Sequence, residues 1–408
     1  MTVVMPSGTV NQKTIILRTP GRRATRDPFD GPGSAPFEAA EAAANARVEF
    51  DDKLDSNGLR AVLDDPTVLA FAPAMPMTLI EPVESSQDVT EAGAATWGVD
   101  AVGATSSPFT GSGVTVAVLD TGIDVSHPAF DAVDLTAKDF TGSGSADDTH
   151  GHGTHCAGTI FGRQVDGMRI GVATGVTKAL IGKVLGGPGG GGSDTLCEAI
   201  MWAADNGANV ISMSLGMDFP GWVNTLVDTR NLSIPVATSI ALEQYRANIR
   251  LFEQLSNLLG ARAAVAQTVL VAAASGNESG RNATPPFVIN VAPPAASAGI
   301  VSVGALGQTP DGLRIAPFSN TRATVAAPGV KVTSAKAGGG TTAMSGTSMA
   351  TPHAAGVAAL WAEKLAAQGS LNPIVLQARL VGSATLNPLV SGTDPLDVGA
   401  GLVQAPAV

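Results

Sequence analysis

Three short segments of this chain each present one reactive side chain among small residues. They are Val-Ala-Val-Leu-Asp-Thr-Gly-Ile-Asp (116–124), Gly-His-Gly-Thr-His-Cys-Ala-Gly-Thr (151–159) and Gly-Thr-Ser-Met-Ala-Thr-Pro-His (346–353). A serine hydroxyl becomes a good nucleophile when a base takes its proton, and a carboxylate holds that base in the required tautomer. Asp120, His152 and Ser348 therefore supply the parts of a nucleophilic hydrolase.

The histidines of the second segment raise the alternative of a metal site. His150, His152 and His155 lie together in a chain that holds five histidines. His152 and His155 are three residues apart without the glutamate of the metalloprotease pattern, so no metal ligands are predicted here. Asp124 is the other carboxylate near Asp120. It lies beyond the Thr-Gly turn, which favours Asp120 as the partner of the base.

The three segments follow one another in the order Asp, His, Ser, and this order distinguishes unrelated families that use the same residues. The order and the long matching segments resemble the subtilisin-like serine proteases, from about Ala94 to about Val403. The resemblance implies an endopeptidase that cleaves peptide bonds through an acyl-enzyme. It also implies that Asp120 orients His152 as the base and that Ser348 is the nucleophile.

A fourth segment, Ala-Ala-Ala-Ser-Gly-Asn-Glu (272–278), resembles the one that carries the oxyanion donor of the family. The resemblance implies that the side-chain amide of Asn277 stabilises the developing oxyanion, a contribution of about 3–4 kcal/mol in such sites. Ser348 opens a helix of small residues, so its backbone N–H is expected to be a second donor. The alternatives are an Asn that closes a turn and a Ser that caps a helix.

Two stretches of small residues resemble the edges that bind extended peptides in the family. They are Leu185-Gly186-Gly187-Pro188 followed by Gly189, Gly190, Gly191 and Gly192, and the segment Ser214-Leu215-Gly216. A substrate between them would add a strand and place alternate side chains in pockets. His150 is expected to line the cleft, and Glu278 to face the first specificity pocket and favour basic or polar side chains. A phosphate-binding loop is disfavoured because no Gly-Lys-Ser/Thr ending follows.

The composition indicates a large globular chain rather than a nucleic-acid or membrane protein. The chain has 408 residues, 44% of them hydrophobic and 14% charged, which is enough for a sizeable core. The net charge is −11, and this argues against nucleic acid as a partner. An apolar stretch of about 18 residues, as a membrane span would need, does not occur, so no membrane partner is expected.

The N-terminus and the cysteines bear on the compartment. Met-Thr-Val-Val-Met-Pro-Ser-Gly lacks the basic and apolar regions of a signal peptide. This predicts a cytoplasmic protein, or a secreted one if a signal peptide has been removed. Cys156 and Cys197 are the two cysteines, and both lie in expected core elements. Free buried thiols are therefore predicted rather than a disulfide framework.

From Gly113 onward, apolar strands alternate with longer helical stretches. This pattern predicts an α/β fold with a mainly parallel central sheet and helices on both faces. The predicted strands are 114–119, 179–184, 210–214, 268–273, 300–304 and 324–326, and the predicted helices are 152–161, 193–206, about 240–267 and 348–366. Ligands of such folds bind at the carboxyl ends of the strands, and Asp120 directly follows the first strand.

Residues 1–90 differ from the rest and predict a small α+β domain ahead of a catalytic domain at 91–408. Strands are expected at 13–18, 47–51, 68–72 and 77–80, and helices at 37–46 and 56–63, the latter capped by Ser56 or Asn57. The layout and the segment 63–71 resemble the inhibitory propeptide of the family. The resemblance implies that this domain blocks the cleft until a cut between about Ile80 and Thr96. The alternative is an unrelated N-terminal domain.

The stretch 217–259 is longer than the short turn that the family has after Ser-Leu-Gly. It predicts an insertion beside the cleft that begins with a loop at 218–222, and the alternative is a surface loop without a role. No strong calcium site is predicted, because Ala129 stands where the family often has an aspartate. A weak structural calcium site would lie at Asp147 and Asp148. No other cofactor is expected.

Three functions fit the sequence to different degrees. The favoured one is a serine endopeptidase that acts on protein or peptide substrates and has its own N-terminal segment as inhibitor. A maturation protease for one partner or leader peptide would share the triad and use the insertion for specificity. An inactive peptide-binding module of the same fold is disfavoured, because Asp120, His152, Asn277 and Ser348 are all present.

Overall fold

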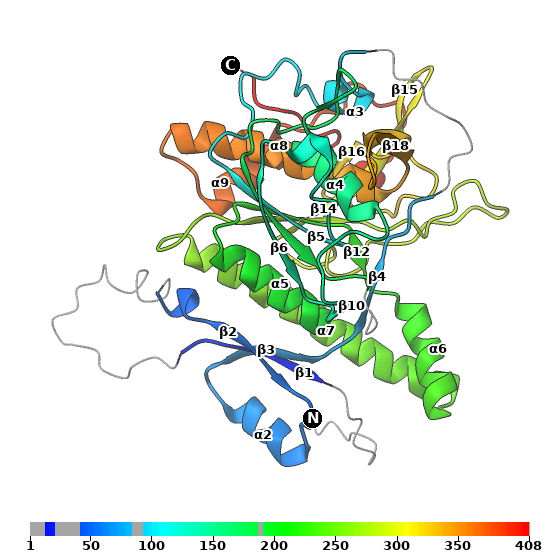
Figure 1. Ribbon diagram of the computed structural model, residues 1–408. Coiled ribbons are helices and arrows are strands. Elements are labelled where there is room, and N and C mark those ends of the chain that lie inside the picture. The colour runs from blue at the N-terminus through cyan, green and yellow to red at the C-terminus, as the bar shows by residue number, and fades with distance from the viewer. Residues whose placement is uncertain (1–12, 21–40, 84–92, 187–190, 408) are drawn as a thin grey trace.

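A computed structural model of the chain describes residues 13–20, 41–83, 93–186 and 191–407 (Figure 1). An eight-stranded sheet forms the middle layer of its larger part, with helices on both faces. The strand order is β15-β14-β13-β11-β5-β9-β6, and β16 also pairs with β14. All neighbours are parallel except β14 and β15, so the predicted α/β fold is confirmed.

Six strands of this sheet lie where the sequence predicts them. They are β5 (Thr115–Asp120), β9 (Lys178–Lys183), β11 (Val210–Met213), β13 (Leu270–Ala274), β14 (Ile300–Thr309) and β16 (Val325–Pro328). Two more, β6 (Asp134–Asp139) and β15 (Gly312–Ile315), are not predicted. β6 is an edge strand with largely exposed side chains, so it lacks the apolar run that marks a buried strand.

The helices form layers on both faces of the sheet (Figure 1). One face carries α4 (His152–Phe161), α8 (Thr347–Ala367) and α9 (Pro373–Gly382), and the other carries α5 (Ser193–Asp205) and α7 (Ile234–Arg262). α4, α5 and α8 agree with their predictions. Shorter helices are α3 (Trp97–Ala101), η1 (Pro128–Phe130) and α10 (Pro395–Val398).

Alternate residues of β5 supply the two cores of the larger part. Val116 and Val118 belong to the buried cluster that includes α4 and α8, whereas Ala117 and Leu119 belong to the one that includes α5 and α7. β5 is thus apolar on both faces, as expected for a central parallel strand. Its last residue, Asp120, lies at the carboxyl edge of the sheet.

The N-terminal part forms a three-stranded antiparallel sheet, in which β1 (Thr14–Arg18) lies between β2 (Arg47–Asp51) and β3 (Val68–Pro73). Helix α2 (Ser56–Asp64) is capped by Asp55, so the predicted caps are wrong by one or two residues. The Asp55 carboxylate accepts from the N–H groups two and three residues on, which an aspartate does well. Of the helix predicted at 37–46, residues 37–40 lie outside the described residues and 41–44 are helical.

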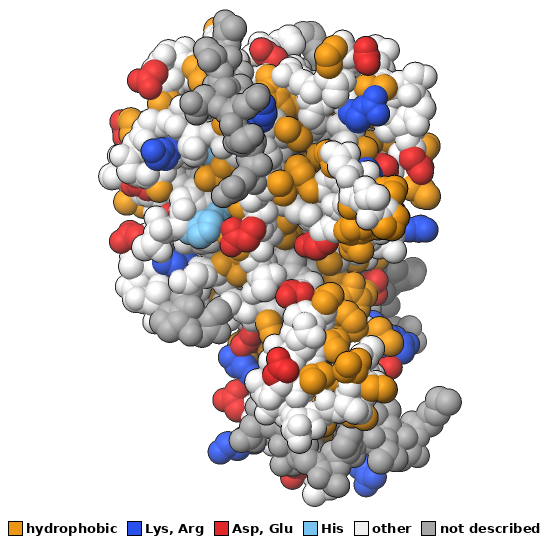
Figure 2. Space-filling view, turned by 90° about the vertical axis from the view of Figure 1, so that its right-hand side faces the viewer, with side chains coloured by type: hydrophobic (Ala, Val, Ile, Leu, Met, Phe, Trp, Pro, Cys, Tyr) orange, Lys and Arg blue, Asp and Glu red, His pale blue; other side chains and the backbone are white. Residues whose placement is uncertain are grey.

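The N-terminal sheet packs against α5 and α7, and the space-filling view shows it as a narrower lobe below the larger part (Figure 2). An ion pair of 2.7 Å joins Lys13 to Asp194 across this contact. The chain then leaves the lobe as β4 (Pro76–Leu79) and pairs with β10 (Gly191–Gly192) and β12 (Leu215–Gly216) of the larger part.

The stretch expected to be an insertion folds as a helical hairpin of α6 (Phe219–Arg230) and α7. The loop predicted at 218–222 is wrong, because this segment starts α6. The Asp218 carboxylate accepts from the N–H of Gly221, and Pro220 lies in the first turn, where its missing N–H costs nothing. These residues are a helix start signal rather than a loop signal.

Two small hairpins complete the described fold. β17 (Val332–Ala335) pairs with β18 (Thr341–Met344), and β7 (Gln164–Val165) pairs with β8 (Met168–Arg169). Among the described residues, no helix combines the length and the apolar character that crossing a membrane requires.

Candidate active site

Asp120 and His152 come from two elements that meet at one edge of the sheet. β5 ends at Asp120, and α4 begins at His152. The Nδ1 atom of His152 lies 2.7 Å from Oδ1 of Asp120, and both side chains are buried. Burial alone would lower the pKa of His152. The charge of Asp120 and their hydrogen bond outweigh burial and hold that pKa well above its usual value.

Asp148 fixes the start of α4 against the end of β5. Its Oδ1 atom accepts hydrogen bonds from the Thr121 hydroxyl at 2.9 Å and from the N–H groups of His150 and Gly151 at 3.1 and 2.8 Å. Its Oδ2 atom accepts from the N–H and the hydroxyl of Thr154 at 2.8 and 2.7 Å. Gly151 has a φ of 94°, a left-handed conformation that favours glycine and turns the chain into the helix.

Ser348 and Asn277 are joined by Thr347 at the start of α8. The Oδ1 atom of Asn277 accepts from the N–H and the hydroxyl of Thr347, each at 2.9 Å, which leaves Nδ2 to donate into the cleft. The carbonyl oxygen of Ser348 accepts from the Ser214 hydroxyl at 3.1 Å and from Sγ of Cys156 at 3.4 Å. The backbone of Ser348 is therefore held from behind.

The cleft in front of these side chains is filled by strand β4 of the same chain. β4 is the middle strand of an antiparallel sheet in the order β10-β4-β12. Met77 lies opposite Gly191 on one side, and Leu79 lies opposite Leu215 on the other. An extended segment of the N-terminal part thus runs between the two edges that the sequence predicts for substrate.

Two consecutive carbonyl groups that follow β4 contact the reactive side chains. The Ser348 hydroxyl donates to the carbonyl oxygen of Ile80 at 2.9 Å. Nδ2 of Asn277 donates to the carbonyl oxygen of Glu81, also at 2.9 Å. Nε2 of His152 is buried and has no hydrogen-bond partner among the described residues. The hydroxyl of Ser348 is thus directed at a peptide carbonyl of its own chain.

The side chains of these two residues lie in different surroundings. Ile80 is 5% exposed, and a Cβ atom at Gly216 would lie 3.5 Å from its Cδ1 atom, so its side chain packs over Gly216. The Glu81 side chain is 70% exposed, and its carboxylate lies 3.7 Å from Nε2 of His150. The cleft therefore encloses the aliphatic side chain and leaves the acidic one at its mouth.

Sequence comparison decides the family. A family model described as the subtilase family matches residues 111–401, which contain all four predicted segments. The chain belongs to the subtilase family. This subtilase is 34% identical to alkaline elastase YaB from Bacillus sp. (strain YaB), over 80% of this chain and 73% of that protein. It is also 34% identical to subtilisin Savinase from Lederbergia lenta, over 76% of this chain and 97% of that protein.

A solved structure supports the fold. The fold of this subtilase resembles that of fervidolysin from Fervidobacterium pennivorans, described as a keratinolytic enzyme related to subtilisin. The TM-score is 0.64 and the identity 21%, with 96% of this chain and 60% of that chain covered. The family and its relatives make this subtilase a serine protease, a hydrolase of peptide bonds. None of these matches supports the cytoplasmic location expected from the N-terminus.

Three of the eight residues predicted to bind substrate pair with β4 in the subtilase. They are Gly191, Leu215 and Gly216, and the neighbouring Gly192 of the same predicted edge pairs with Pro76. Gly189 and Gly190 lie outside the described residues. Ser214 precedes the paired residues, but its hydroxyl is directed at the backbone of α8. Ser214 therefore holds the backbone of Ser348 and does not pair with β4.

Glu278 is hydrogen-bonded to Asn320, which lies between β15 and β16. Its carboxylate accepts from Nδ2 of Asn320 at 2.6 Å, and its N–H donates to Oδ1 of the same residue at 3.1 Å. These two bonds hold the loop that follows Asn277 in place. That Glu278 also faces the first specificity pocket stays a prediction.

The predictions of a packed His155 and of two free, buried cysteines are confirmed. Nε2 of His155 lies 2.9 Å from the carbonyl oxygen of Val332, and burial together with the nearby His152 lowers the pKa of His155 to about 3. It is a packed, neutral histidine. Cys156 and Cys197 are free and buried.

Three residues that position Asp120, His152 and Ser348 were not predicted to do so from sequence. Asp148 and Thr347 act through the hydrogen bonds described above, and Cys156 lies one helical turn after His152, with Sγ 3.8 Å from Nδ1 of that histidine. The spacing of four residues on one helix is a signal that could have identified Cys156. Asp148 precedes the helix by a few residues, which is a capping signal.

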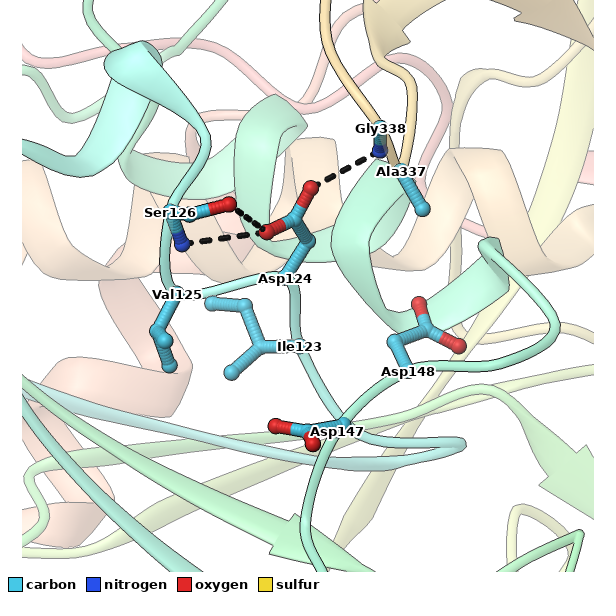
Figure 3. Close-up of a pocket in the computed structure, with 8 residues that line it drawn as sticks. All are labelled: Ile123, Asp124, Val125, Ser126, Asp147, Asp148, Ala337 and Gly338. Atoms are coloured by element: carbon cyan, nitrogen blue, oxygen red, sulfur yellow. Dashed lines mark hydrogen bonds between the residues drawn. The ribbon is translucent and has the colours of Figure 1, made fainter.

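A pocket of about 310 Å³ lies beside the end of β5 (Figure 3). Its carboxylates do not converge: Asp124 accepts from the N–H and hydroxyl of Ser126 and from the N–H of Gly338, while Asp147 and Asp148 point in different directions. Asp124 therefore links two loops and is not a partner of the base, as predicted. A weak calcium site at Asp147 and Asp148 stays a prediction. The carboxylate oxygens of Asp148 already accept hydrogen bonds from protein donors.

Three side chains of the site could in principle meet at a metal ion. Ligand atoms of Asp120, His152 and Cys156 lie within 4.8 Å of one another. However, Nδ1 of His152 is hydrogen-bonded to Asp120, and a nitrogen that carries this proton has no lone pair for a metal. Burial raises the pKa of the Cys156 thiol, which also disfavours the thiolate that a metal needs.

Proposed function

We propose that this subtilase is a serine endopeptidase that works through Asp120, His152 and Ser348 and is made with an inhibitory N-terminal segment. The observation that carries the proposal is the path of β4. An extended segment runs between β10 and β12 and brings the carbonyl group of Ile80 to the hydroxyl of Ser348. A peptide substrate bound in the same way would present its scissile carbonyl to the nucleophile.

The chemistry follows from the positions of the donors and acceptors. Oγ of Ser348 attacks the carbonyl carbon, and its proton passes to Nε2 of His152, which makes no hydrogen bond to the described part of the chain. Asp120 holds Nδ1–H of His152 and stabilises the imidazolium that forms. The oxyanion of the tetrahedral intermediate accepts from Nδ2 of Asn277. This amide is aimed by its two bonds to Thr347.

Collapse of the intermediate completes the first half of the reaction. The C–N bond breaks, His152 returns its proton to the leaving amine, and Ser348 remains as an acyl-enzyme. Water then attacks the ester through the same base. Protonation removes the lone pair that the base needs, so activity is expected to fall as pH drops through the raised pKa of His152.

We infer that the bond between Ile80 and Glu81 is cut, which requires the Ile80 carbonyl oxygen to move from the Ser348 hydroxyl to Nδ2 of Asn277, the amide that now holds the Glu81 carbonyl. The nucleophile contacts the Ile80 carbonyl, and the Ile80 side chain is enclosed in the cleft. The following bond, Glu81–Pro82, ends in a proline nitrogen, which carries a rigid ring in place of an N–H. On the far side, the N–H of Val83 donates to the carbonyl oxygen of Ser345 at 2.7 Å, so the chain is held on both sides of the bond.

Occupation of the cleft explains inhibition. β4 occupies both edges that a substrate would use, and a tethered segment acts at a high effective concentration. After a cut at Ile80–Glu81, the tether is lost and the docked segment is held by its contacts alone. Release or degradation of the segment then opens the cleft to protein or peptide substrates.

A time course of the full-length protein tests this proposal. Intact mass, the new N-terminus and peptidase activity are followed in the same samples, with Ser348→Ala as the control that cannot cut. The proposal expects a new N-terminus at Glu81 and activity that rises after the cut, while the variant stays whole. Full activity of an uncut chain would overturn the inhibitory role. A start at Pro82 would place the cut one residue later.

A further inference from the structure

The contacts of the N-terminal segment extend beyond the strand β4. Upstream of β4, Met75 and Ser193 are joined by two hydrogen bonds: the N–H of Met75 donates to Oγ of Ser193 at 3.0 Å, and the N–H of Ser193 donates to the carbonyl oxygen of Met75 at 2.9 Å. Both residues are buried. Ser193 of the larger part therefore binds the extended backbone at Met75, just before β4 pairs with β10 and β12.

One more contact lies further upstream, on the helical hairpin. Nδ2 of Asn248, in α7, donates to the carbonyl oxygen of Pro73 at 2.9 Å and to the carbonyl oxygen of Gln244 at 2.9 Å. The Asn248 side chain is fully buried, and its Oδ1 atom has no hydrogen-bond partner among the described residues. A buried amide oxygen without a donor is costly, so it marks a place where a donor is missing.

The residue at the end of β3 explains which donor is missing. The N–H of Ala74 donates to the carbonyl oxygen of Lys13, toward β1. In an extended chain, neighbouring residues direct their polar groups to opposite sides, so the groups of residue 73 point away from β1, toward α7. Residue 73 is a proline, which offers a carbonyl group and no N–H. Any other residue there would present both groups to the Asn248 amide.

The face of α7 that carries Asn248 is braced by α6. Nε1 of Trp222 donates to Oε1 of Gln244 at 2.6 Å, and the rings of Phe219 and Tyr245 meet edge to face with centroids 5.5 Å apart. Gln244 is one helical turn before Asn248. The hairpin of α6 and α7, which is the stretch predicted to be an insertion, thus holds the Asn248 amide in a fixed position.

We propose that Asn248 is a backbone-binding subsite of the mature enzyme, at the position now occupied by Pro73, and that it recognises extended protein substrates. The proposal rests on the proposed function, because it takes β4 as a guide to substrate. A segment that reaches from residue 73 to the cut would add hydrogen bonds to Ser193 and Asn248. A residue other than proline at the far position would bind better, because its N–H satisfies Oδ1 of Asn248.

Peptides of two lengths test the proposal on wild-type enzyme that has been allowed to process itself from the full chain. The short peptide has the sequence of residues 76–83, the long peptide that of residues 72–83, and a third is the long peptide with alanine in place of proline 73. We expect kcat/KM to be about fivefold higher for the long peptide than for the short one, from the net strength of a hydrogen bond. The alanine peptide should gain about fivefold again, mainly through KM.

The variant Asn248→Leu assigns the effect to the amide. It should remove the advantage of both longer peptides and leave hydrolysis of the short peptide unchanged. Asn257→Leu is the matched control, because Asn257 is an exposed asparagine of the same helix. If Asn248→Leu also loses activity on the short peptide, the wild-type comparison of three peptides decides alone.

Two outcomes would overturn the proposal. One is equal kcat/KM for all three peptides on the wild-type enzyme. The other is an advantage of the long peptides that survives in Asn248→Leu. Failure of the proposed function would look different, since the short peptide would then not be hydrolysed in any form of the protein.

Discussion

The N-terminal lobe and the larger part bury their apolar residues in different ways. One of the two cores, the cluster under α4 and α8, is built wholly from the larger part. Among its described residues the lobe has no comparable core, because Ile15, Leu17 and Ala72 belong to a cluster that they share with α5 and α7. The described residues of the lobe thus share their core with α5 and α7, whereas the cluster under α4 and α8 contains none of them.

The polar contacts of the two parts differ in the same sense. In the larger part, Asp120, Asp148 and Asn277 are each held by hydrogen bonds at or near buried positions. In the lobe, Arg18 pairs with Glu49 and Asp65 at partly exposed positions, where an ion pair contributes little. This contrast suits a segment that must be released from an active site that must keep its geometry.

The largest expected effect is on chemistry in the larger part. Ser348→Ala should lower kcat by roughly 10⁶ while leaving the fold intact, with a residual rate over water of roughly 10³–10⁴ from binding and the oxyanion donor. The measurement is peptide hydrolysis with circular dichroism on the same sample. Turnover at the wild-type level in the purified variant would show that another residue is the nucleophile.

The next effect concerns the oxyanion donor. Asn277→Ala should lower kcat by about 10²–10³ with little change in KM, because the amide acts on charge that develops in the transition state. Steady-state kinetics on one peptide measure both constants. A loss confined to KM would mean that Asn277 binds the ground state of the substrate instead.

A change in the lobe should act on activation rather than on chemistry. Ile15 is fully buried in the shared cluster, and Ile15→Ala should weaken the docked lobe by about 2–4 kcal/mol. Activity should then appear sooner after purification, with the same final kcat. Leu63→Ala is the matched control, because Leu63 is 63% exposed. Equal activation times for the two variants would contradict a lobe stabilised by the shared cluster.

The smallest effect tests how the larger part holds the start of α4. Burial would raise the pKa of Asp148, but hydrogen bonds from Thr154 and Gly151 outweigh it and lower that pKa. The carboxylate therefore contributes stability above its unfolded pKa of about 4, and this contribution is lost as pH falls through the lower folded value. Asp148→Asn should cost about 2 kcal/mol at neutral pH.

Thermal unfolding of the Asp148→Asn variant and the wild type across pH provides the measurement. The difference in unfolding free energy between the variant and the wild type should be widest near pH 7 and should shrink as pH falls below about 4. A gap that stays constant over this range would mean that the charge of Asp148 has no part in holding α4.

The reactive residues could be predicted from sequence because each sits in a local signal. Asp120 ends an apolar strand, His152 starts a helix after glycine, and Asn277 follows a run of alanines. A central parallel strand is apolar on both faces, so it forms an uninterrupted run of apolar residues in the sequence. The fold class was predictable for this reason, whereas the choice of Asp120, His152, Asn277 and Ser348 rests on the resemblance to the family.

The residues that support the site are harder to predict, because their partners are distant in the sequence. Asp148 acts on the end of β5, which lies 27 residues earlier, and Asn248 acts on Pro73, which lies 175 residues earlier. The edge strand β6 carries no apolar run, and the start of α6 resembles a loop in its proline and glycine content. Of these features, only the contact of Asn248 depends on how the two parts meet.

Labelling of Ser348 by a fluorophosphonate probe tests the central claim most directly. The probe is added to full-length protein at successive times, and the labelled serine and the chain length are identified together by mass spectrometry. The account predicts that the intact chain resists the probe and that label appears on Ser348 in step with the fragment that begins at Glu81. Rapid labelling of the uncut chain, or label on a different serine, would contradict an active site blocked by its own strand.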